Sequence, residues 1–112
     1  MKITYANKRV EKYFSDYEAM KKKISPDWVR IVKKHIDRLI AADNFEIFKS
    51  LGLGHLEPLQ GKDVGKYSLR ITGNVRLIIK PEQNGKSVKI CEEVLIEGVV
   101  DYHGRKQTWY IP

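Results

Sequence analysis

The segment Tyr67–Ile79, with the sequence YSLRITGNVRLII, sets the architecture of the chain. Apolar and polar residues alternate on both sides of a central Gly-Asn pair, which is the pattern of two strands joined by a tight turn. We predict a three-residue turn, Thr72–Asn74, because a two-residue turn would mix an arginine into the apolar face. A buried face penalises a slip of one residue severely. The apolar face then comprises Tyr67, Leu69, Ile71, Val75, Leu77 and Ile79, and the other face carries Ser68, Arg70, Arg76 and Lys80, with Arg70 opposite Arg76.

The part of the chain before this hairpin predicts helices. A short strand at Ile3–Tyr5 is followed by apolar residues at every third or fourth position over Asn7–Met20. Ser25–Asp27 then indicates a new helix start, because a capping serine precedes a proline at the first helical position. We expect Asp43 to cap one further short helix at about Asn44–Ser50.

The part after the hairpin predicts two more strands. An Asn-Gly turn leads to an expected strand at Ser87–Ile90, and a last strand runs from about Val94 to His103 with a candidate bulge at Gly98. We expect Asp101 and His103 to share the open face of the sheet with the arginines. The order of elements is typical of an α+β fold, with an N-terminal strand and a helical hairpin packed on one face of an antiparallel sheet.

Length and composition predict one soluble domain over residues 1–112. The single cysteine, Cys91, excludes an intramolecular disulfide and a cysteine-based zinc site, which fits the reducing cytoplasm. The N-terminus lacks the apolar run of a signal peptide, and no stretch approaches the ~20 apolar residues of a membrane span. We expect a cytoplasmic protein that uses no metal and no cofactor.

The charge balance favours a polyanionic partner. The chain has 21 Lys and Arg against 14 Asp and Glu, a formal net charge of +7. Neutralising phosphates with such cations releases condensed counterions, so nucleic acid or a ribonucleoprotein is the expected partner. An acidic protein is the main alternative.

The end of the last strand, Asp101–His103, combines an acid, a phenol and an imidazole. RNA cleavage by a 2′-hydroxyl needs a base, a cation for the charge on phosphorus and an acid for the leaving oxygen. Arg70 and Arg76 suit the second role because the planar guanidinium matches phosphate oxygens. The alternative is that the arginines form surface ion pairs with Asp101 or Glu97, which would stabilise little.

Other conspicuous residues have structural interpretations. His35 lies on the apolar stripe of the second long helix and Trp28 near its start, so we expect both in or near the core. The Gly-rich link around His55 follows no strand and opens no helix, which excludes a dinucleotide-binding loop. We expect Trp109 and Tyr110 to dock the C-terminus rather than to stack on a base.

Four segments fall in the order and spacing of a known family: Leu56–Gly61, Gly65–Arg70, Gly73–Ile78 and Asp101–His103. In this respect the chain resembles the HigB toxins of the RelE/ParE superfamily, the plasmid maintenance system killer proteins. The resemblance implies a microbial-RNase-like α+β fold that enters the ribosomal A site and cleaves mRNA there. It also implies a neighbouring helix-turn-helix antitoxin, HigA-like, and a toxin–antitoxin heterotetramer as one form of the complex.

The resemblance also assigns roles to residues. The expected catalytic residues are Glu57, Arg76, Asp101, Tyr102 and His103, with Glu57 as base, Arg76 as phosphate clamp and His103 as acid. The residues expected to hold the RNA backbone are Lys62, Lys66, Arg70, Arg105 and Lys106. Relatives often have histidine and lysine where this chain has Glu57 and Gln60, and the chain continues nine residues past His103. These departures leave two alternatives open: a non-nucleolytic toxin that binds a protein such as gyrase, and an RNA- or ribosome-binding module that has lost catalysis.

Overall fold

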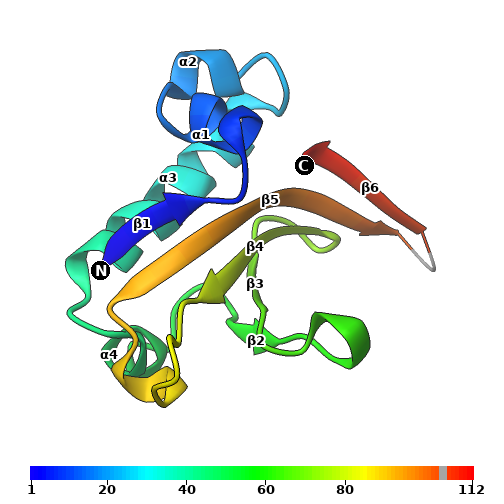
Figure 1. The fold of residues 1–112 in the computed structure, drawn as a ribbon. Helices are drawn as coiled ribbons and strands as arrows, with labels where there is room; N and C mark the ends of the chain where they lie inside the picture. Colours follow the sequence, from blue (N-terminus) through cyan, green and yellow to red (C-terminus); the bar gives the residue numbers. More distant parts are fainter. Residues whose placement is uncertain (104–105) are drawn as a thin grey trace.

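The protein folds as helices on one face of a twisted sheet (Figure 1), in a computed structural model that describes residues 1–103 and 106–112. The His103 side chain is also outside the described part. The helices are α1 (Lys8–Phe14), α2 (Tyr17–Met20), α3 (Pro26–Ala41) and α4 (Phe45–Ser50), with 3-10 turns η1 (Gly61–Asp63) and η2 (Val88–Ile90). The strands are β1 (Lys2–Tyr5), β2 (Glu57–Pro58), β3 (Tyr67–Arg70), β4 (Val75–Pro81), β5 (Glu93–His103) and β6 (Lys106–Ile111). The predicted α+β class is therefore confirmed.

Strand β5 is the centre of the sheet. The strand order is β1-β5-β4-β3-β2, and β6 also pairs with β5. Strand β4 covers one edge of β5, whereas β1 and β6 follow each other along the other edge. Strand β1 pairs parallel to β5, so the prediction of a wholly antiparallel sheet is wrong at this edge. A parallel neighbour requires a crossover, and the helical segment between β1 and β2 begins that crossover.

The β3–β4 hairpin has the predicted register. Leu69 lies opposite Leu77 and Arg70 opposite Arg76. The backbone N–H of Ile71 donates to the carbonyl of Val75 over 2.9 Å, which leaves three residues in the turn. The six predicted apolar residues of this face are buried or half-buried under the helices, whereas Arg70 and Lys80 on the other face are exposed.

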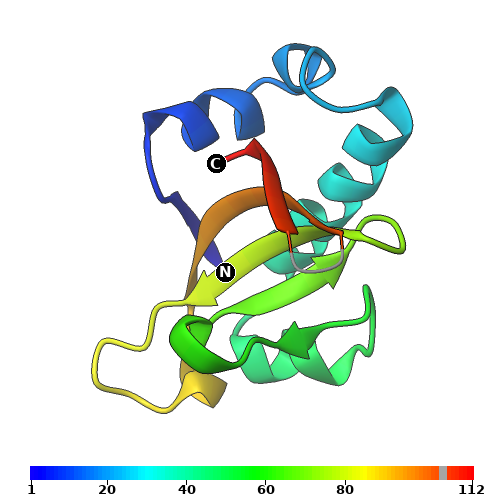
Figure 2. The same ribbon diagram turned by 90° about the vertical axis from the view of Figure 1, so that its right-hand side faces the viewer.

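The core lies between this face and the helices, with α3 and α4 behind the strands in Figure 2. Helix α3 begins as predicted, because the Ser25 hydroxyl accepts from the backbone N–H of Trp28. The expected single helix before it is two helices, because the Asp16 carboxylate caps the start of α2. Asn44, not Asp43, caps α4. Both corrections concern short polar side chains that compete for neighbouring backbone N–H groups.

The segment expected as a strand at Ser87–Ile90 is instead the turn η2. The Ser87 side chain accepts from the backbone N–H of Lys89 and starts a 3-10 turn there. Strands β2 and β6 were not predicted. Strand β2 has only two residues, and β6 depends on pairing with β5, which local sequence does not reveal.

The candidate bulge at Gly98 is confirmed. Ile79 lies opposite Ile96 and Ile78 opposite Gly98, so Glu97 is an extra residue in β5. One extra residue reverses the alternation of side chains along the strand. Ile96 before the bulge and Val99 after it therefore both face the helices and are fully buried.

His35 is buried beneath the sheet, as predicted. Its Nε2 lies 2.8 Å from the backbone oxygen of Arg70, to which the ring N–H donates. Burial lowers the pKa of His35 below its ordinary value of 6.5. The hydrogen bond to the backbone of Arg70 acts in the opposite direction and raises the pKa, whereas the positive charge of Arg38 lowers it further. The neutral ring is therefore the form that the fold favours.

Acidification from pH 7 to pH 5 is expected to lower the free energy of unfolding through His35. Its folded pKa lies below the unfolded value of 6.5, so the unfolded chain binds the proton more readily. The contribution of neutral His35 to stability is complete above pH 6.5, the pKa of the unfolded chain. It is lost as the pH falls from 6.5 through the lower pKa of the folded protein. Urea unfolding of the wild type and of His35→Gln, which keeps an N–H donor without titrating, measures the difference. An equal loss of stability in both proteins would contradict this role.

Candidate functional site

The face of the sheet opposite the helices carries most of the predicted site residues, and we call it the open face. Four residues on neighbouring strands lie directly opposite one another in a row across it: Arg70, Arg76, Val100 and Trp109. Directly opposite residues project to the same side of a sheet. Arg76 is half-buried within the row, whereas Arg70 and Trp109 at its ends are exposed.

A hollow of about 270 Å³ opens beside this row. It is lined by Glu57, Leu59, Ser68, Gly73, Asn74, Arg76 and Tyr102. Three of the predicted catalytic residues, Glu57, Arg76 and Tyr102, therefore meet here from β2, β4 and β5. They supply a carboxylate, a guanidinium and a phenol around one open space, which we call the first hollow.

The β3–β4 turn holds the Arg76 side chain in place. One guanidinium nitrogen, Nη1, donates to the backbone oxygen of Thr72 and, over 3.2 Å, to that of Val75. Within the described residues, no acidic side chain forms an ion pair with Arg76. The other N–H groups of the guanidinium are thus oriented, and no carboxylate among the described residues neutralises their charge. They are therefore suited to binding an anionic ligand.

Tyr102 is tied to the same turn through its backbone. Its N–H donates to the backbone oxygen of Asn74 over 2.9 Å, which joins the end of β5 to the β3–β4 turn. Burial raises the pKa of the Tyr102 phenol, and Asp63 raises it further, while Arg76 acts in the opposite direction. The phenol is therefore protonated at neutral pH and can donate a proton or a hydrogen bond.

Among the described residues, Glu57 contributes the one carboxylate that lines the first hollow. It lies on the edge strand β2 opposite Ser68, which is buried. Glu57 is exposed, and none of the ion pairs between described residues involves it. An exposed carboxylate of this kind is available to accept a proton.

Asp101 does not join this group, so the prediction that it shares the open face with the arginines is wrong. It lies opposite Val75, on the side of the helices. Its Oδ2 accepts from the Tyr110 hydroxyl over 3.4 Å, and its Oδ1 is buried with no partner among the described residues. The bulge at Gly98 reverses the strand's alternation, which sends Tyr102 to the open face and Asp101 away from it.

The remaining predicted residues either do not line the first hollow or lie outside the described part of the chain. Lys66 forms ion pairs with Asp63 at 3.8 Å and with Glu97 at 3.4 Å, so acids partly neutralise it. Lys62 and Lys106 are exposed. The His103 side chain and Arg105 are not among the described residues. The alternative that Glu97 pairs with an arginine is wrong, because its partner is Lys66.

A second hollow of about 190 Å³ adjoins the first. It is lined by Leu59, Lys62, Asp63, Lys66, Ile78, Tyr102, Gln107 and Trp109. Leu59 and Tyr102 line both hollows, so the two form one continuous surface. Trp109 lines this hollow, whereas the sequence predicts that it docks the C-terminus rather than stacking on a base. Tyr110 does dock, with its ring 5.4 Å from that of Trp28 in an edge-on arrangement.

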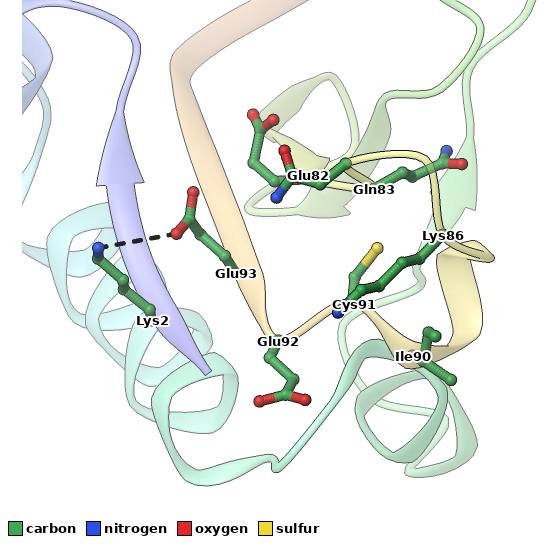
Figure 3. A pocket seen from close by; sticks show the side chains of 9 residues that line it. Lys2, Glu82, Gln83, Lys86, Ile90, Cys91, Glu92 and Glu93 are labelled. Carbon is green, nitrogen blue, oxygen red and sulfur yellow. Dashed lines mark ion pairs between the residues drawn. The ribbon is translucent and has the colours of Figure 1, made fainter.

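A third hollow, of about 320 Å³, lies around the start of β5 (Figure 3). Its charged side chains are of both signs, and Lys2 and Glu93 form an ion pair across it at 3.8 Å. It contains none of the predicted site residues. Among the described residues, no cluster of His, Cys, Asp and Glu is suited to a metal ion. None of the helices in the described part of the chain is long and apolar enough to span a membrane.

The comparisons with known proteins agree with this fold. A family model for the RelE-like toxin HigB of type II toxin–antitoxin systems matches residues 3–103. A YoeB/ParE toxin from Agrobacterium tumefaciens superposes with a TM-score of 0.58 at 21% identity, covering 92% of this chain and 99% of that one. A YoeB–YefM complex from Staphylococcus aureus gives 0.57 at 20% identity, covering 92% and 97%. A search of curated proteins finds no match.

Proposed function

We propose that this chain, which belongs to the HigB-like family of RelE-like toxins of type II toxin–antitoxin systems, is a ribosome-dependent endoribonuclease that cleaves mRNA. The observation that carries the proposal is the Arg76 guanidinium, which the turn orients beside Glu57 and Tyr102 without an acidic partner among the described residues. A phosphodiester seated at Arg76 would have a base and an acid within the same hollow. The net charge of +7 supports an RNA partner.

The proposed reaction is an attack of the RNA 2′-hydroxyl on the adjacent phosphate. Glu57 accepts the proton of the 2′-hydroxyl as the bond from its oxygen to phosphorus forms. Arg76 stabilises the negative charge that builds up on the phosphate oxygens. The bond from phosphorus to the 5′-oxygen breaks, and Tyr102 gives its proton to that oxygen. The products are a 2′,3′-cyclic phosphate and a 5′-hydroxyl end, and proton exchange with water restores both side chains.

Tyr102 and His103 are the two candidates for the proton donor. The family resemblance favours His103, because an imidazole can give or take a proton near neutral pH. The geometry favours Tyr102, which lines the first hollow beside Arg76 and is protonated at neutral pH. Lys62, Lys66, Arg70, Arg105 and Lys106 remain the proposed contacts to the RNA backbone.

We also propose that the chain acts in the cytoplasm and is neutralised by an antitoxin. The similar fold of the toxin in the YoeB–YefM complex supports a protein partner of this kind. The family resemblance favours a HigA-like helix-turn-helix antitoxin and a toxin–antitoxin heterotetramer as one form of the complex.

Replacing Glu57 by Gln or Tyr102 by Phe is expected to slow mRNA cleavage by roughly 10²-fold or more, because each removes a proton-transfer group. The measurement is induced expression followed by mapping of mRNA 5′ ends, which should carry 5′-hydroxyl groups. His103→Gln, tested in parallel, identifies the acid. Glu92→Gln is the matched control, because Glu92 is an exposed glutamate of the third hollow. Growth arrest without new mRNA ends would contradict cleavage and support a protein target such as gyrase.

A further inference from the structure

Trp109 is an exposed aromatic residue on the open face of the sheet. All the aromatic residues of the chain lie in the described part, and Trp109 alone among them is exposed, with 39% of its surface accessible. It lies on β6, beyond the residues 3–103 that the family model matches. The match to the family model therefore ends before this residue.

The position of Trp109 relates it directly to the proposed cleavage site. It lies opposite Val100, which in turn lies opposite Arg76, so Trp109 and Arg76 project from the same face two strands apart. Two strand spacings amount to about 10 Å, a span that one or two nucleotides of an extended single strand can cover. Tyr102 lines both hollows and therefore lies between the first hollow, which contains Arg76, and the second hollow, which contains Trp109.

The backbone of β5 supports one edge of the indole. A Cβ built on Gly98 would lie 3.3 Å from Cζ3 of Trp109, so the ring packs over the glycine. Strand pairing of β6 with β5 fixes the backbone that carries the ring. The part of the ring that faces solvent is thus held in place before any ligand arrives. A rigid aromatic surface of this kind stacks on a base at low entropic cost.

The side chains around the ring suit a nucleotide. Lys62, exposed on η1, contributes a cation to the second hollow, and Gln107, opposite Tyr102, contributes an amide with both donor and acceptor groups. Proteins that bind single strands combine such cations with aromatic platforms. Asp63 lies in the same hollow, and its pairing with Lys66 limits its repulsion of a phosphate.

We propose that Trp109 is a base-stacking subsite for single-stranded RNA. A nucleotide next to the one cleaved enters the second hollow, its base stacks on the indole, and Lys62 lies near its phosphate. The subsite rests on the proposed function, since it requires RNA to occupy the first hollow. It gives β6, which lies beyond the residues that the family model matches, a part in RNA binding.

A leucine and a phenylalanine at position 109 separate stacking from packing. Both cover Gly98, but only phenylalanine offers a ring. Trp109→Leu is expected to weaken binding of a 2′-O-methyl RNA hexanucleotide, which lacks the attacking hydroxyl, by roughly 5- to 100-fold, with a smaller loss for Trp109→Phe. Fluorescence anisotropy of the labelled hexanucleotide gives the affinity. Ile40→Ala, which trims an exposed apolar side chain on α3, is the control and should bind as the wild type does. Thermal unfolding of each variant verifies the fold.

Abasic hexanucleotides locate the stacked base. Removing the base at one position should weaken binding to the wild type and leave binding to Trp109→Leu unchanged, because the variant has already lost that contact. The subsite is overturned if the wild type and Trp109→Leu bind the intact hexanucleotide with equal affinity. It is also overturned if each abasic position weakens binding equally in the two proteins, or if the wild type shows no detectable binding. A loss of antitoxin affinity without a loss of hexanucleotide affinity would assign Trp109 to a protein interface instead.

The two proposals fail separately. If the wild type cleaves mRNA and Trp109→Leu cleaves and binds equally well, the subsite falls and the nuclease proposal stands. If the wild type produces no mRNA ends but the abasic series still depends on Trp109, the nuclease proposal falls and RNA stacking stands.

Discussion

Arg76→Ala is expected to lower the rate of mRNA cleavage by roughly 10²–10³-fold, the effect of removing one oriented donor to a transition-state oxygen. The expected loss depends on the position of the Arg76 guanidinium as much as on its charge. Backbone oxygens of Thr72 and Val75 hold the guanidinium, and no carboxylate of the described residues competes for it. The measurement is the single-turnover rate of cleavage on programmed ribosomes, together with growth arrest on induction.

Arg70→Ala is the matched comparison, because Arg70 lies directly opposite Arg76 on the same face and carries the same charge. It is exposed at a strand end and lines neither hollow, so its loss is expected to weaken RNA binding more than the cleavage step. Arg76→Lys should retain part of the binding but little of the rate, because the ammonium lacks the planar fork. Equal rates for Arg70→Ala and Arg76→Ala would show that charge on this face, rather than the position of Arg76, is what matters.

The stability of the Arg76 variants must be measured beside their rates. The guanidinium donates to two backbone oxygens of the turn, and a lost hydrogen bond of this kind costs about 1 kcal/mol. That cost is expected to lower the unfolding temperature by a few degrees. A rate loss that greatly exceeds the change in the folded fraction is therefore a loss of chemistry.

The hairpin at the centre of the site could be predicted because its information is local. Alternation along Tyr67–Ile79 and the residues of the turn determine the register, and the register determines that Arg70 faces Arg76. The start of α3 is equally local, since a serine and a proline in sequence suffice. These signals involve neighbours a few residues apart, where backbone geometry leaves few alternatives.

The residues that β5 contributes to the site could not be predicted, because the direction of their side chains depends on where the extra residue of the bulge lies in the strand. The bulge was expected at Gly98, but which of Asp101 and Tyr102 then faces the arginines depends on pairing with β4. Side chains alternate with a period of two, so one extra residue exchanges their faces. Strand β6 is a second nonlocal feature: its pairing with β5 brings Trp109 into the second hollow.

Gly98→Ala is expected to destabilise the protein by about 3 kcal/mol or more, because strain and overpacking combine at this residue. Its φ of 144° lies in the region that side chains rarely adopt, and a Cβ would approach the backbone oxygen of Ile111 to 1.9 Å. A backbone oxygen in a paired strand cannot move aside as a flexible side chain can. Strand β6 must therefore shift or separate from β5.

Hydrogen exchange and oligonucleotide binding distinguish local from global effects of Gly98→Ala. We expect faster exchange across β6, a lower unfolding temperature and the same loss of hexanucleotide affinity as in Trp109→Leu, since the indole depends on this pairing. Gly73→Ala is the matched control: Gly73 has an ordinary φ and no heavy atom within 4 Å of a built Cβ. Its unfolding temperature should stay close to that of the wild type. If the two variants unfold alike, the close packing of β6 on the bulge does not restrain the strand, and the rigid support inferred for Trp109 is lost with it.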